Sequence, residues 1–222
     1  NPMTNPTLIK REASIVILGS FNPAIFRPAW FVKEKIIGPN DVDATKDEFA
    51  TSEIARFPLS WGLVEVLSNR FLVHTSDQGS FAPMRDLVVH VFTTLGHTPV
   101  KQFGINGIVE YRLPDEKTWN AFGDVLAPKS IWQKILPEPI GLLTMVMQAP
   151  RQDGLKGVTH IKLGGAANWG VRFDINNHIE LEDGGTGALL RILSENWDRL
   201  QDDLLKTSKT ILNETLKCIP QP

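Results

Sequence analysis

Polar and apolar side chains alternate along two neighbouring strand-like segments, residues 158–163 and 171–181. A strand turns successive side chains to opposite faces, so the polar set should lie on one side of a sheet. If the hairpin across residues 164–170 pairs Lys162 with Asp174, then His160 lies opposite Asn176. This candidate ligand or partner face comprises His160, Lys162, Arg172, Asp174, Asn176 and His178.

The chemistry available to this face is proton transfer and hydrogen bonding, with His160 or His178 as a possible base. A polar row is also the ordinary water-facing side of an antiparallel sheet. No nucleophile stands at a recognisable spacing from a base, since the chain has no Gly-x-Ser-x-Gly motif. We therefore predict no catalytic residues and favour a protein that is not an enzyme, with an enzyme at His160/His178 as the alternative.

The turn Gly19-Ser20-Phe21-Asn22-Pro23 directly follows a short apolar strand, residues 14–18. It resembles the opening of the nucleotidyltransferase family, in which such a turn precedes a His-x-Gly-His motif that binds nucleotide phosphates. Here Ile25 and Pro28 occupy the histidine positions and Arg27 the glycine position. Without imidazoles nothing there stabilises charge on a transferring phosphoryl group. The turn is a second candidate site, and its simpler interpretation is a helix start at Asn22-Pro23.

Metal and redox chemistry find little support in the sequence. The five histidines show neither His-x-x-x-His nor His-Glu-x-x-His spacing. The single cysteine, Cys218, cannot close an intrachain disulfide or build a zinc site from several cysteines, and it suits a reducing cytoplasm. We expect neither a metal nor another cofactor.

The composition is that of an ordinary globular protein of 222 residues, with 23 basic and 25 acidic residues and a formal net charge of -2. This balance provides no general attraction to a nucleic-acid backbone, so we expect no nucleic-acid partner. The longest strongly apolar runs, residues 13–18 and 140–146, are far shorter than the roughly 20 residues of a membrane-spanning helix. No signal peptide is visible, and we expect a cytoplasmic protein without membrane contact.

The hydrophobic periodicity predicts the same order of elements twice: strand, helix, two or three strands, helix. We interpret residues 1–12 as a disordered or cloning-derived leader, residues 13–99 as a first α+β half, and residues 100–222 as a second α+β half. The two halves should form one antiparallel sheet with helices on one face, as an internal duplication. Gly104 and Gly107, within a strand over residues 100–113, are interpreted as β-bulges.

A long helix is predicted at the C-terminal end, from near residue 186 to about residue 217, close to 45 Å at 1.5 Å per residue. One stripe of this helix carries Leu190, Trp197, Leu204 and Ile211. Either the stripe covers the apolar face of the sheet, or the helix extends past the sheet and the stripe forms the seam of an oligomer. On the second alternative we expect a homo-oligomer.

The chain as a whole resembles a bacterial protein family to which no activity is assigned. The resemblance rests on Phe21-Asn22-Pro23, Pro28-Ala29-Trp30-Phe31, Thr98-Pro99-Val100, Gly104-Ile105-Asn106 and Leu126-Ala127-Pro128. It implies a bacterial, intracellular setting. The doubled sheet also resembles the saddle-shaped repeats of TATA-binding proteins, without their basic surface.

Two hypotheses about function follow from these observations. The first is a non-catalytic binding or assembly protein that meets a protein partner or a second copy through its polar face and long helix. The alternative is a nucleotide or polar-metabolite binding protein or enzyme that uses the Gly19–Pro23 turn or the His160/His178 face.

Overall fold

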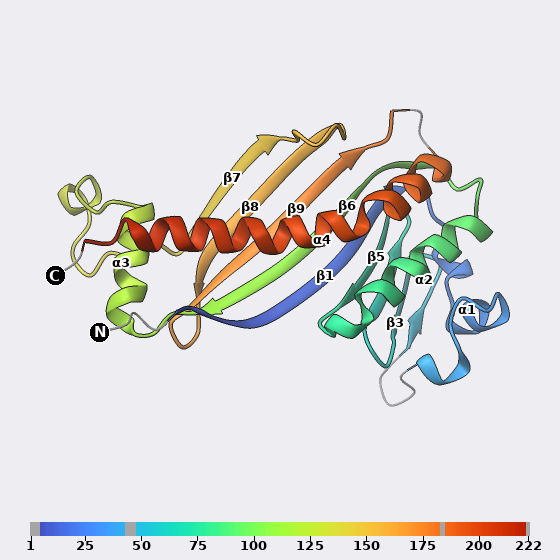
Figure 1. Cartoon of the computed structure of the whole chain (residues 1–222). Coiled ribbons are helices and arrows are strands. Elements are labelled where there is room, and N and C mark those ends of the chain that lie inside the picture. Colours follow the sequence, from blue (N-terminus) through green and yellow to red (C-terminus); the bar gives the residue numbers. More distant parts are fainter. Residues whose placement is uncertain (1–4, 43–47, 183–184, 221–222) are drawn as a thin grey trace.

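The computed structural model describes residues 5–42, 48–182 and 185–220 (Figure 1). Its centre is an antiparallel sheet of nine strands in the order β2-β3-β4-β5-β1-β6-β9-β8-β7. The strands are β1 (Thr7–Gly19), β2 (Phe49–Ala50), β3 (Ile54–Pro58), β4 (Leu63–Leu67), β5 (Arg70–Thr75), β6 (Val100–Arg112), β7 (Thr144–Pro150), β8 (Gly157–Ala166) and β9 (Gly170–Glu180). The helices are α1 (Pro28–Lys33), α2 (Phe81–Thr94), α3 (Glu116–Leu126) and α4 (Thr186–Lys217). The predicted α+β class, with one antiparallel sheet and a long C-terminal helix, is confirmed.

The strand order is mirrored about the pair β1–β6 at the centre of the sheet. Outward from β1 lie β5, β4 and β3, and outward from β6 lie β9, β8 and β7. Each half therefore places its first strand at the centre and its later strands, in reverse order, toward the edge. Duplication of the two halves stays a prediction.

Two details of the strands differ from the sequence-based expectation. β1 begins at Thr7, and residues 7–12 pair with the far end of β6, so this part of the expected leader belongs to the sheet. The charges at Lys10, Arg11 and Glu12 concealed that extension, and none of residues 7–12 is buried. Residues 1–4 lie outside the described residues. β3, which the sequence analysis did not predict, pairs with β4.

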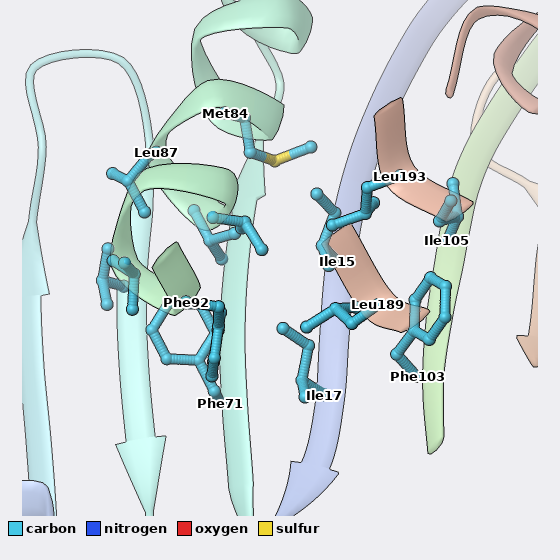
Figure 2. Close-up of a cluster of buried hydrophobic side chains, with 14 of the residues drawn as sticks. Ile15, Ile17, Phe71, Met84, Leu87, Phe92, Phe103, Ile105, Leu189 and Leu193 are labelled. Atoms are coloured by element: carbon cyan, nitrogen blue, oxygen red, sulfur yellow. The ribbon is translucent and has the colours of Figure 1, made fainter. Parts of the chain in front are cut away.

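Helices cover one face of the sheet, and on this face every second residue of β4, β5 and β9 is buried. Figure 2 shows part of this core, in which apolar side chains of β1, β5 and β6 meet those of α2 and α4: Ile15, Ile17, Phe71, Phe103, Ile105, Met84, Leu87, Phe92, Leu189 and Leu193. Phe71 and Phe92 meet edge to face, with ring centroids 5.3 Å apart. Each fully buried side chain of this size contributes about 1.5–3 kcal/mol of hydrophobic stabilisation.

α4 lies along the sheet and packs against β6, α2 and α3 (Figure 1). Trp197 and Leu204 are each only 2% exposed, and they belong to the hydrophobic core of the single chain. A side chain covered in this way cannot also contact a second chain, which corrects the expected oligomer seam at these two positions. Leu190 and Ile211 lie partly exposed at the borders of the buried stripe. None of the described helices combines the length and apolar character that crossing a membrane requires.

Gly107 explains how closely α4 approaches the sheet. A Cβ atom at Gly107 would lie 2.9 Å from Cδ1 of Leu204. The register of β1 with β6 runs without a shift through residues 104 and 107. The expected β-bulges at Gly104 and Gly107 are therefore wrong, and Gly107 instead makes room for a helix side chain.

Candidate functional site

The face of the sheet opposite the helices carries the predicted polar side chains. β8 and β9 pair as expected: Lys162 lies opposite Asp174, and His160 lies opposite Asn176. Arg172 and His178 are two residues away from Asp174 and Asn176 along β9, so alternation places them on the same face. The structure thus brings all six predicted residues onto one surface, which we call the open face.

A single cross-strand row of hydrogen-bonding residues runs through the open face. Asn176 of β9 pairs with Asn106 of β6, which pairs with Ser14 of β1, which in turn pairs with His74 of β5. On the other side His160 pairs with Gln148 of β7. We call this set the polar row: His74, Ser14, Asn106, Asn176, His160 and Gln148. His160 Nε2 and Gln148 Oε1 are 2.7 Å apart, within hydrogen-bond distance.

Sequence reasoning missed Ser14, His74 and Asn106 as members of this row. Their proximity depends on the order β5-β1-β6-β9-β8-β7, which joins strands from both halves of the chain. The available signal was Asn106, the polar residue of the otherwise apolar segment 103–109. A polar side chain in a strand needs either a hydrogen-bond partner in the protein or contact with solvent.

The centre of the polar row borders a shallow depression of about 320 Å³. Its side chains come from β1, β5, β6 and β9: Glu12, Ser14, Leu72, His74, Asn106, Ile108, Asp174 and Asn176. The amide oxygens of Asn106 and Asn176 are shielded from solvent and have no hydrogen-bond partner. A Cβ at Gly104 would lie 2.9 Å from Asn106 Oδ1 and 3.3 Å from Asn176 Oδ1, so the glycine leaves space into which both oxygens turn.

Charged residues occupy the next two rows on one side of the polar row, with equal numbers of cations and anions. One neighbouring row joins Lys162, Asp174, Ile108 and Glu12, and the next joins Arg172, Glu110 and Lys10. Lys10 Nζ lies 2.7 Å from Glu12 Oε1. Because the cations and anions of these two rows balance, they offer no broad electrostatic attraction to a polyanion.

The Gly19–Pro23 turn, the second candidate site, is hydrogen-bonded through its backbone to neighbouring segments of the fold. The backbone N–H groups of Gly19, Ser20 and Phe21 donate to the carbonyl oxygens of Asn69, Pro99 and Ser68, at 3.2, 3.0 and 2.8 Å. The Asn22 side chain accepts a hydrogen bond from Ala24 N at 3.1 Å and caps a short helical turn. Since an anion at a chain turn is held by free N–H groups, this turn is built as a connection in the fold.

A second polar cluster fixes the β7–β8 hairpin to α4 on the helix side. Arg151 donates to both carboxylate oxygens of Asp153 and to Asn177 Oδ1, the last at 2.8 Å. Arg199 of α4 donates to Asp153 Oδ2 at 3.0 Å. Burial acts to raise the pKa of Asp153, but hydrogen bonds from Arg151 and Arg199 outweigh it and hold the pKa below its ordinary value.

Catalytic and metal chemistry can be compared with the geometry of the part of the chain that the structure describes. Ser14 and His74 are direct cross-strand partners and have the residue types of a nucleophile and a base. No hydrogen bond between their side chains is present in the described ranges. Within those ranges no three histidine, cysteine, aspartate or glutamate side chains gather as metal ligands would.

Fold and face together define an α+β protein whose antiparallel sheet is covered by helices on one side and presents a row of polar side chains on the other. No protein-family model matches the chain, and no curated protein matches it.

Proposed function

We propose that this chain is a non-catalytic binding protein that holds a protein partner on the open face. The observation that carries the proposal is the polar row, which crosses six adjacent strands on the face without helices. At about 4.8 Å between strands, the row spans about 24 Å. A surface of this length exceeds most metabolites and matches a protein surface or an extended segment of one.

Specific hydrogen bonds, rather than net charge, would select this partner. The row holds amides, a hydroxyl and imidazoles, and the next two rows on one side of it have charges of both signs. The depression between β5 and β9 is large enough for one side chain of the partner. That side chain would contact the polar side chains of Ser14, His74 and Asn106 that line the depression.

A polar metabolite in the same depression is the second candidate. Its volume of about 320 Å³ is near the lower end of the usual range for small-molecule pockets, about 300–1,000 Å³. The intracellular bacterial setting, including a cytoplasmic location, is part of the proposal and rests on the sequence resemblance and the lone Cys218.

Replacing both central amides tests the open face. In Asn106→Leu/Asn176→Leu the side chains keep similar volume and lose their hydrogen-bonding groups. Because the lost oxygens are unpartnered, we expect the variant to fold with unchanged or higher stability. Wild type and variant, purified from the native host, are compared by mass spectrometry of bound species, and the affinity of each identified species is measured by calorimetry. We expect at least tenfold weaker binding of a protein partner, about 1.4 kcal/mol or more.

The matched control makes the same change on the helix side of the molecule, in Asn120→Leu/Asn213→Leu, since both asparagines are exposed there. It should bind within about twofold of wild type. A retained small molecule that the open-face variant loses would favour the metabolite candidate. A partner that the open-face variant holds with full affinity would refute the use of this face.

A further inference from the structure

β7 is the outermost strand on one side of the sheet, and it lacks the features that usually protect an edge. It contains no charged residue, its pairing with β8 runs without a bulge, and six of its seven residues are exposed. Exposed edge strands normally carry lysines, internal prolines or bulges, or are very short. The opposite edge fits that rule, because β2 is two residues long. β7 is thus open to pairing with another strand (Figure 1).

The backbone groups that β7 offers can be assigned from its hairpin. Arg151 N donates to Gly157 O at 3.1 Å, one step beyond the pair Pro150–Val158. In an antiparallel ladder, residues that exchange hydrogen bonds alternate with residues that do not. Met145, Met147 and Ala149 therefore direct their N–H and C=O groups at β8, whereas Thr144, Val146 and Gln148 direct theirs outward. Pro150, which has no N–H, falls on the outward side, where a proline is tolerated.

We propose that β7 pairs antiparallel with β7 of a second copy of this chain, about a two-fold axis at Val146. Val146 then exchanges both hydrogen bonds with the Val146 of the other copy, and Thr144 exchanges both with Gln148. On the helix side Met145 of one copy lies opposite Met147 of the other. In the single chain Met147 is 62% exposed. The proposal is independent of the proposed use of the open face.

In this register both copies use the same strand surface, as an isologous contact requires. Thr144, Val146 and Gln148, whose backbone groups point away from β8, each lie opposite a residue of the same set in the other copy. The two side chains of every opposing pair lie on the same face of the sheet. No like charges meet, because β7 carries none. A pairing of seven residues gives a small interface, on the order of 1,000 Å² in total, so we expect a dimer that forms at micromolar concentration.

The substitution Val146→Lys tests the dimer. Val146 is 56% exposed, so the change should leave the fold intact while placing two ammonium groups across the axis. We expect wild type to be a dimer by light scattering at about 50 µM and the variant to be a monomer, with at least tenfold weaker association. Phe49→Lys, an equally exposed residue on the opposite edge strand, is the matched control and should remain dimeric. A monomeric wild type, or a dimer that Val146→Lys leaves intact, would overturn the proposal.

Cross-linking tests the register itself. In a Cys218→Ser background, Val146→Cys should form a disulfide-linked dimer under mild oxidation, since paired residues on antiparallel strands have Cα atoms about 5.5 Å apart. Phe49→Cys in the same background should stay mostly monomeric. Equal cross-linking of both variants would show random collision and contradict the register, as would the absence of cross-linking at position 146.

Discussion

Replacing Trp197 with alanine should lower the free energy of unfolding by about 3–5 kcal/mol without changing the oligomeric state. The indole is 2% exposed and packs in the larger hydrophobic cluster with neighbouring α4 residues, so its removal leaves a large cavity between α4 and the sheet. For a domain of this size the midpoint of thermal unfolding should fall by roughly 10 °C. Urea and thermal unfolding at two protein concentrations measure both quantities.

Ile211→Ala is the comparison for this experiment. Ile211 belongs to the same predicted stripe but is only partly buried, so its truncation should cost about 1 kcal/mol. If Trp197→Ala instead kept its stability and separated an oligomer into monomers, Trp197 would lie at an interface between chains and its placement in the core would be wrong.

Local patterns were sufficient to predict most of the fold. In β9, Phe173 and Ile175 alternate with Asp174 and Asn176, and the structure buries the first pair and leaves the second partly exposed on the open face. The predicted bounds of the last helix agree with α4, because a broad apolar stripe continues from Leu189 to Leu216. Short or charged strand segments were harder: β3 is five residues long, and the first part of β1 carries exposed charges.

For the candidate site, too, the residues that depend on a local pattern were predicted and those that depend on distant strands were missed. The pairing of His160 with Asn176 follows from one hairpin, so alternation within a short stretch was enough to predict it. Ser14 and His74 join the row only because β1 lies between β5 and β6. That neighbourhood depends on long-range pairing, which no local pattern encodes. For Trp197 the sequence could not show what the helix packs against. A helical stripe has the same spacing whether it covers the chain's own sheet or a second chain.

The ion pairs around Asp153 connect elements that are far apart in the sequence. Arg151 has a side chain only 3% exposed, and its charge is balanced by the carboxylate of Asp153 within the same hairpin. Arg199 extends the cluster to α4. Removing one member of such a pair leaves a charge that is neither hydrated nor compensated, and this loss is larger than the net benefit of forming the pair.

The substitution Asp153→Asn should therefore destabilise the protein by about 2–3 kcal/mol at pH 7, below the value for a fully buried pair because the Asp153 side chain remains 21% exposed. The lowered pKa of Asp153 determines the pH dependence. A carboxylate with a lowered pKa contributes stability above its unfolded pKa, near 3.9, and loses that contribution as pH falls toward its folded pKa. The difference between wild type and variant should thus be constant from pH 7 to about pH 5 and shrink below pH 4.

Urea unfolding of both proteins at pH 7, 5 and 3 measures this difference directly. Asp198→Asn, an exposed carboxylate on the same helix as Arg199, is the matched control and should change stability by less than about 0.5 kcal/mol at each pH. A difference between wild type and Asp153→Asn that stayed the same at pH 3 would show that the ionised carboxylate is not what holds Arg151. In that case the Asn177 amide oxygen, which accepts from Arg151 and from the Thr159 hydroxyl, would have to hold the Arg151 side chain in place.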